Sequence, residues 1–130
     1  MIAKTQLMLL MAVVVPLVGC GDGKPPRYSL SGVVTFDGQP IPEGSIMFQA
    51  ADKRSAPDTA QIVDGKYSLK LQAGQKLVMV EASKFVGPED KTMGVRPRDQ
   101  YIPHRYNVES KLTMEVKPQD GNVYDLPLQK

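Results

Sequence analysis

The chain has 130 residues, with 16 lysines and arginines against 14 aspartates and glutamates, a formal net charge of +2 at pH 7. A charge this balanced gives no indication of a nucleic-acid partner, which would need a clustered basic face. The chain has a single cysteine, Cys20, and therefore no intramolecular disulfide, so a folded domain of this size must be held together by its hydrophobic core.

The first 19 residues have the pattern of an export signal. Lys4 is followed by an apolar run, Leu7–Val18, and Cys20 comes shortly after that run. A basic start, an apolar run of about 7–15 residues and small residues at its end are typical of a secretory signal. A membrane-spanning helix needs about 20 apolar residues, and Pro16 would break or kink a helix. We therefore expect residues 1–19 to be a cleaved signal peptide.

The sequence LVGC at 17–20 resembles the lipobox of bacterial lipoproteins. The resemblance implies that a diacylglycerol is attached to the thiol of Cys20 and that the chain is cut just before this residue. Two acyl chains, at about 0.8 kcal/mol per buried CH₂, hold a protein firmly to a membrane, whereas one chain does not. It also implies a membrane-anchored lipoprotein of the cell envelope, facing the periplasm or the exterior. The alternative is an ordinary signal peptide with a free cysteine.

Removal of residues 1–19 leaves 111 of the 130 residues, the usual size of one domain. Residues 20–27 contain two prolines and two glycines and are expected to form a short, lipidated tether. Residues 28–130 are then the folded domain.

From Tyr28 onward the apolar residues alternate with period two, which predicts strands. Asp37-Gly38 and Asp64-Gly65 are turn signals, and the second lies at the centre of the clearest hairpin, 60–71. The expected strands fall within residues 28–36, 44–50, 60–71, 76–85, 111–117 and 122–128.

About seven short strands result, with no long helical pattern. Because one sheet would bury only one face of each strand, two sheets packed face to face are expected. Clean alternation favours antiparallel pairing. The sequence therefore predicts an all-β fold, a seven-stranded antiparallel Greek-key β-sandwich.

Four segments resemble known families. The sequences at 32–48, 64–71 and 73–80 are similar to the carboxypeptidase regulatory-like domain, a prealbumin-like (transthyretin-like) β-sandwich, and 101–116 resembles the closing part of small bacterial lipoproteins built on that module. The resemblance implies this fold and a non-catalytic accessory or binding role.

Enzymatic function is not expected. A transthyretin-like hydrolase would need more than one histidine and a Tyr-Arg-Gly-Ser tail, and an intradiol-type dioxygenase would need two histidines and two tyrosines for iron. The chain has one histidine, His104, and ends in LPLQK. No serine lies in a nucleophile-elbow motif.

No cofactor or metal is expected either. Asp37, Asp64, Asp120 and the pair at 89–90 are oxygen ligands of the kind that calcium prefers, but they form no calcium-loop series. The three single aspartates each precede a glycine, so they are interpreted as turn residues that bond to their own backbone.

The segment 86–110 lacks a strand pattern, and a loop of this length in a compact domain is either functional or disordered. It contains the candidate binding residues: Arg96, Arg98, Tyr101, His104, Arg105 and Tyr106. Arginine pairs with anionic groups and tyrosine gives flat contact surfaces. The alternative is structural: Tyr101, Ile102 and Tyr106 fasten the loop to the domain, and nearby acids pair with the arginines.

We therefore expect a lipid-anchored, non-catalytic envelope module with a binding or structural role. Its partner is expected to be an envelope protein, with an envelope polysaccharide as the alternative and a small hydrolase as the less favoured competitor. Strand addition at a sheet edge is a second route to a protein partner.

Overall fold

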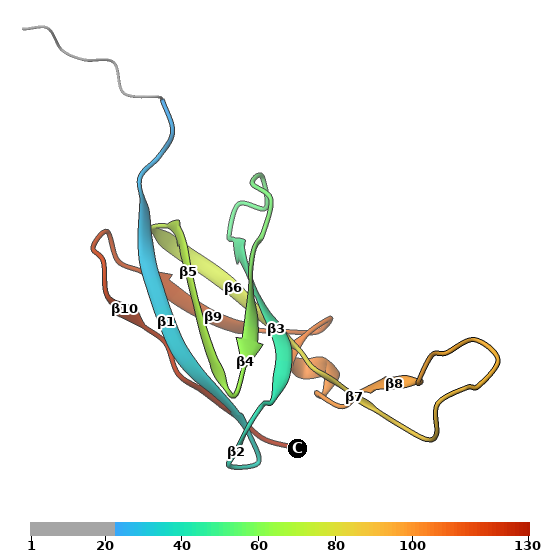
Figure 1. Ribbon diagram of the computed structural model, residues 1–130. Helices are drawn as coiled ribbons and strands as arrows, with labels where there is room; N and C mark the ends of the chain where they lie inside the picture. The colour runs from blue at the N-terminus through green and yellow to red at the C-terminus, as the bar shows by residue number, and fades with distance from the viewer. Residues whose placement is uncertain (1–22) are drawn as a thin grey trace, which may run out of the picture.

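In a computed structural model, the structure describes residues 23–130, which form an all-β fold with a single turn of 3-10 helix (Figure 1). The strands are β1 (Arg27–Phe36), β2 (Gln39–Pro40), β3 (Glu43–Ala50), β4 (Asp58–Val63), β5 (Lys66–Gln72), β6 (Gly74–Glu81), β7 (Ser83–Phe85), β8 (Arg98–Gln100), β9 (Leu112–Val116), β10 (Asn122–Val123) and β11 (Leu126–Leu128), and the 3-10 turn is η1 (His104–Tyr106). The predicted all-β class is confirmed, and every expected strand range contains at least one strand. The signal peptide and Cys20 lie outside the described residues.

One curled sheet carries nine of the strands, in the order β10-β1-β5-β4-β3-β6-β9, with β2 and β11 also pairing with β1. Strands β4 and β5 share only the pair Val63↔Lys66 next to their turn. They separate beyond it, so the sheet folds back on itself and its two halves enclose the core (Figure 1).

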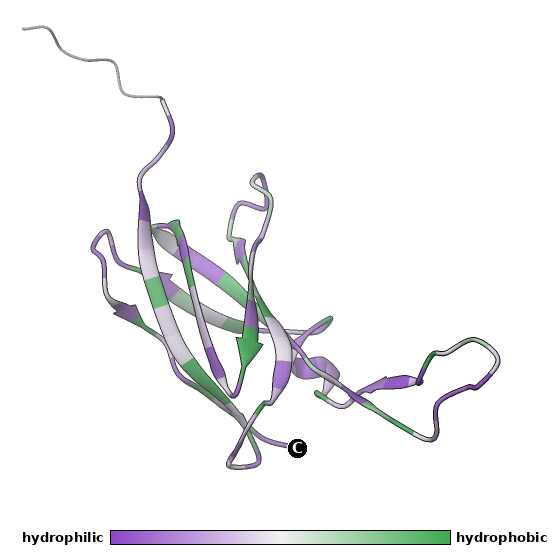
Figure 2. Ribbon diagram, viewed as in Figure 1, coloured by the Kyte–Doolittle hydropathy of each residue, from purple (hydrophilic) through white to green (hydrophobic). Residues whose placement is uncertain are grey.

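The period-two pattern explains the core. Along β6, Val78 and Val80 are fully buried, while Gln75 and Glu81 point to solvent. Figure 2 shows the same alternation of hydrophobic and hydrophilic residues along the strands. Burying a side chain of this kind contributes roughly 1.5–3 kcal/mol. The largest fully buried side chains are Phe48, Leu30, Ile41, Ile46, Ile62, Leu71, Val34, Val78, Val80 and Val116.

Both Asp-Gly turns form as predicted. The φ angles are +50° and +81° at Asp37-Gly38, and +51° and +78° at Asp64-Gly65. Two consecutive positive φ angles are the requirement of the tight turns that close two-residue hairpins, and glycine meets it without strain.

The prediction of antiparallel pairing throughout is wrong for the last two strands. Both run parallel to β1, with Leu30 opposite Asn122 and Val34 opposite Leu126. The reason lies in β9, which ends beside the beginning of β6, at the same end of the sheet where β1 begins. The chain turns there and then follows β1 in the same direction.

The expected strand 76–85 is divided. Its first part is β6, and after Ala82 the chain leaves the main sheet as β7 to pair with β8. The segment 86–110, predicted to contain no strand, therefore contains β8 and η1. Three-residue strands between prolines carry too few alternating positions for the sequence pattern to show them.

Candidate functional site

The candidate binding residues separate into two groups in the structure. Arg96 and Arg98 lie on a hairpin, residues 83–100, that extends away from the curled sheet and is called the arm below (Figure 1). The other four residues follow the arm: Tyr101 comes directly after β8, and His104, Arg105 and Tyr106 form η1.

The arm is built from two short ladders. Strands β7 and β8 pair from Ser83↔Gln100 to Phe85↔Arg98, and an isolated bridge joins Asp90 to Val95 nearer the tip. At the tip, the Asp90 carboxylate accepts hydrogen bonds from the backbone N–H groups of Thr92 (2.8 Å) and Met93 (3.3 Å). Asp90 thus closes its own turn, as expected for an aspartate in this setting.

Phe85 is the centre of the exposed surface of the arm. Its ring is 49% exposed, and the guanidinium carbons of Arg96 and Arg98 lie 5.0 and 4.5 Å from the ring centroid. Each exposed cation–π contact contributes about 0.5–1 kcal/mol. The two contacts hold both guanidinium groups beside one aromatic ring, and we call these three residues the Phe85 cluster.

The nearby acids of the structural alternative, Glu89, Asp90 and Asp99, form no ion pair with these arginines. Residues 23–130 contain two ion pairs by distance, and the one on the arm joins Arg98 to Glu43 of β3 at 3.3 Å. Both side chains are well exposed, so this pair contributes at most about 1 kcal/mol. Arg96 donates to the Gly87 carbonyl oxygen at 3.3 Å, which leaves most of its donors free for a ligand.

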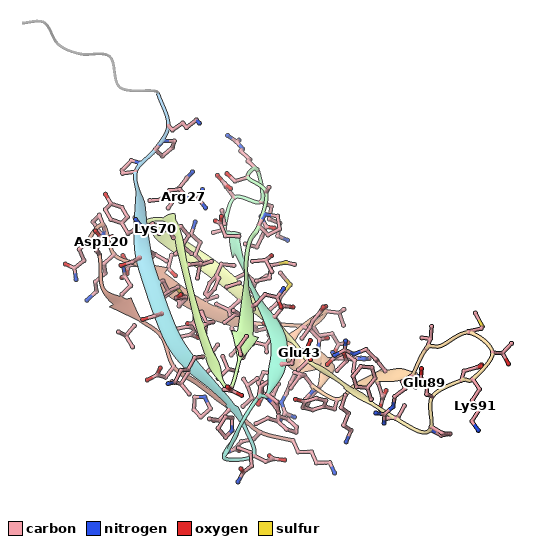
Figure 3. The ribbon with its side chains drawn as sticks, viewed as in Figure 1. Arg27, Glu43, Lys70, Glu89, Lys91 and Asp120 are labelled. Atoms are coloured by element: carbon pink, nitrogen blue, oxygen red, sulfur yellow. The ribbon has the colours of Figure 1, made fainter. Side chains whose placement is uncertain are left out.

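The tip of the arm is also apolar. Met93 is 75% exposed and Val95 is 58% exposed. Figure 3 shows Glu89 and Lys91 on the outer part of the arm and Glu43 near its base. The arm as a whole carries four basic and three acidic residues.

Tyr101 and Ile102 of the second group have packing contacts. The Tyr101 ring meets Phe36 edge-on, with centroids 5.7 Å apart, and its backbone N–H donates to the Ala82 carbonyl oxygen. Burial raises the pKa of the Tyr101 phenol above its usual range. Ile102 is 2% exposed. These contacts are the ones that the structural alternative requires.

Arg105 and Tyr106 hold the C-terminal residues. The Arg105 guanidinium donates to the Gln129 carbonyl oxygen at 2.5 Å, and the Gln129 N–H donates to the Tyr106 hydroxyl at 3.1 Å. The hydrogen bond from Gln129 is the main cause that lowers the pKa of Tyr106. His104 is exposed, and its imidazole makes no hydrogen bond or ion pair with another described residue.

The acidic side chains of the described part of the chain are dispersed or bonded to backbone. Residues 23–130 hold no group of three or more His, Cys, Asp or Glu side chains arranged to bind a metal ion. The prediction that the turn aspartates bond to their own backbone is wrong for two of them: Asp37 accepts from the Lys130 N–H and Asp120 from the Ser29 N–H, each at 2.9 Å, so these carboxylates join segments that are distant in sequence. Within the same residues no helix has the length and hydropathy to cross a membrane.

Sequence reasoning missed Phe85 and Glu43. Both lie outside the segment 86–110, and both become part of the surface through the pairing of β7 with β8. An available signal was the aromatic residue at the end of the run 76–85, since an exposed aromatic residue is common in binding surfaces.

No protein-family model and no curated protein matches the chain. Among solved structures, the chain is similar to a DUF3823 family protein from Parabacteroides merdae, with a TM-score of 0.44 and 17% identity over 80% of this chain. A DUF3823 family protein from Bacteroides ovatus has a TM-score of 0.45 and 18% identity over 78% of this chain. The chain spans 46% and 44% of the lengths of these two proteins. Similarity at this level assigns neither a family nor a function to the chain.

Proposed function

We propose that this protein is a lipid-anchored, non-catalytic module of the bacterial cell envelope that binds a partner protein through its arm. Cys20 is the lipid attachment site, residues 20–27 are the tether, and the domain is a Greek-key β-sandwich of the prealbumin-like class. The observation that carries the proposal is the exposed Phe85 cluster on a hairpin that extends from the sheet.

The chemistry of the arm favours a protein partner. Aromatic residues, methionine and arginine are enriched in protein interfaces, and hot spots are rich in tryptophan, tyrosine and arginine. The arm combines Phe85, two arginines and an exposed Met93 within one hairpin. An acidic patch with an apolar centre on the partner would match it, because the arginines keep free donors for carboxylates.

The position of the arm suits an anchored protein. The described chain enters the sheet at the start of β1, and β6 also begins at that end, so β7 leaves from the opposite end (Figure 1). An anchor at Cys20 therefore leaves the arm directed away from the membrane surface.

An envelope polysaccharide with acidic groups is the second candidate, because the free guanidinium donors of Arg96 would suit its carboxylates.

Two measurements test the proposal. For the anchor, the mass of the mature protein from cells is compared between wild type and Cys20→Ser, and we expect a diacylated Cys20 as first residue only in wild type.

For the arm, a photo-crosslinking amino acid replaces Met93, and in a control it replaces Val108, which is equally exposed at 76%. We expect one discrete protein adduct from position 93 and none from position 108. Adducts of equal yield from both positions, or an adduct removed by glycan-degrading enzymes, contradict a protein-binding arm.

A further inference from the structure

A pocket of about 270 Å³ lies at the end of the sheet where β1 begins, which we call the N-terminal end. The loop 51–57, the start of β1, the end of β5 and the start of β6 surround it. Its polar lining comes from Arg27, Ser55, Asp58, Gln72 and Lys76. The volume is slightly below the range of about 300–1,000 Å³ that is usual for drug-sized ligands, so the pocket suits a small polar group.

Lys76 is the unusual residue of this pocket. It occupies the inner face of β6, in line with Val78 and Val80, and only 6% of it is exposed. Lysine is almost never buried to this extent without a charged partner. No carboxylate of residues 23–130 lies within ion-pair distance of Lys76, and its ammonium makes no hydrogen bond with them. Every fully buried side-chain nitrogen and oxygen of residues 23–130 has a hydrogen-bond partner, whereas the Lys76 ammonium has none. The ammonium is therefore not fully buried, and it reaches solvent through the pocket.

The other charges of the pocket cancel each other. Arg27 forms an ion pair with Asp58 and also donates to the Lys70 carbonyl oxygen at 3.0 Å. The charge of Lys76 is therefore not compensated by the lining. The Gln72 amide and the Ser55 hydroxyl add neutral donors. A small oxyanion would pair with the ammonium and accept hydrogen bonds from these groups.

The surroundings of the pocket are basic. Residues 24–27, 50–58, 70–76 and 115–120 make up the N-terminal end and carry seven lysines and arginines against four acids. The remainder of 23–130 carries eight basic and nine acidic residues. Figure 3 shows Arg27 and Lys70 close together at this end of the sheet. The positive charge of the domain is thus concentrated around the pocket, which attracts anions.

We propose that this pocket binds a phosphate group, held by the Lys76 ammonium. The phosphate could belong to a phospholipid headgroup or to a soluble phosphate ester. Arg27 is seven positions after Cys20, a reach of about 25 Å at most, so a membrane-anchored chain holds the pocket near the headgroups. Only this choice of source rests on the proposed anchor, because the site itself is made of residues 27–76.

The test is a calorimetric titration of the full chain in a neutral, phosphate-free detergent. The probes are glycerophosphoglycerol, which is the deacylated headgroup of phosphatidylglycerol, and inorganic phosphate. Wild type is compared with Lys76→Gln and with the control Lys91→Gln, which removes the same charge from an exposed position on the arm. We expect millimolar or tighter binding in wild type, weakened at least about tenfold by Lys76→Gln and unchanged by Lys91→Gln. Binding of glycerophosphoglycerol assigns the site to headgroups, and binding of inorganic phosphate alone assigns it to soluble phosphates.

The inference is overturned if neither probe binds wild type, or if Lys76→Gln binds as tightly as wild type. Should Lys76→Gln fail to fold, Ala56→Asp serves instead, because Ala56 is exposed and lines the pocket. A carboxylate there should reduce binding to the same extent, and undiminished binding refutes the site. Acylation plays no part in this titration, so the phosphate site and the anchor can fail separately.

Discussion

Gly32→Ala should strongly destabilise the fold, because the chain between β10 and β11, which runs beside β1, lies directly against Gly32. A Cβ atom at this position would be 1.9 Å from the Tyr124 carbonyl oxygen and 2.9 Å from the Tyr67 hydroxyl. The backbone of Tyr124 would have to move away from β1, since a carbonyl oxygen cannot tolerate carbon this close. Gly32 itself has an ordinary φ angle, so the predicted cost is steric.

The expected loss in free energy of unfolding follows from three hydrogen bonds that hold the chain between β10 and β11 in place. The Tyr124 N–H donates to the Ser31 carbonyl oxygen (2.9 Å), the Tyr67 hydroxyl to the Tyr124 carbonyl oxygen (2.6 Å), and the Val33 N–H to the Asp125 carboxylate (2.8 Å). At about 0.5–1.5 kcal/mol each, their loss costs roughly 1.5–4.5 kcal/mol. That is a large share of the stability of a domain this size.

The assay is urea unfolding, followed by circular dichroism, with hydrogen exchange as a local readout. Gly32→Ala should lower the free energy of unfolding by the amount above and speed amide exchange in β10 and β11. Ser31→Ala is the control, because its side chain is exposed on the opposite face of the same strand. A free energy of unfolding within about 0.5 kcal/mol of wild type would refute the close contact between Gly32 and Tyr124.

Three other perturbations have definite outcomes. Arg98→Ala should lower the free energy of unfolding by less than about 2 kcal/mol, because its Glu43 pair and its aromatic contact are both exposed. A larger loss in urea unfolding would contradict this description of the arm. Burial raises the pKa of Tyr67 above its usual range, so the stability that the protonated phenol contributes is complete below about pH 10 and falls as the pH rises above it. Tyr67→Phe should flatten that fall in urea titrations between neutral and alkaline pH, and an unchanged slope contradicts the assignment. Asn122→Ala should lower the free energy of unfolding by about 2–4 kcal/mol and speed amide exchange in the 117–121 turn. The buried Asn122 side chain accepts from the Lys117 N–H and donates to the carbonyl oxygens of residues 29, 117 and 119. Unaltered amide exchange in that turn would contradict this role.

Much of the fold is predictable because its information is local. Alternation along 28–36 and 60–71 shows the faces of β1, β4 and β5, and the Asp-Gly pairs show where two hairpin turns occur. The parallel course of β10 and β11 depends on where β9 ends, which is a non-local property that no window of the sequence contains.

The candidate site was predictable in part for the same reason. Arg96 and Arg98 stand out as cations in a long segment, but their contact with Phe85 arises only when β7 pairs with β8. The burial of Lys76 likewise depends on the loop 51–57, which lies beside the start of β6. In sequence, the alternation puts Lys76 on the face of Val78 and Val80, but it does not show that a distant loop covers this end of the strand.

The most direct measurement for the proposed function is the yield of the position-93 crosslink in cells that carry an altered Phe85 cluster. The triple change Phe85→Ala, Arg96→Ala and Arg98→Ala is compared with the wild-type background and with the control Lys111→Ala, an exposed residue away from the arm. If two contacts between the Phe85 cluster and the partner are lost, at about 0.5–1 kcal/mol each, the affinity for the partner falls about five- to thirtyfold. The account predicts that the adduct falls to this extent in the triple variant and persists in the control. An adduct of equal yield in all three backgrounds would contradict binding through the arm.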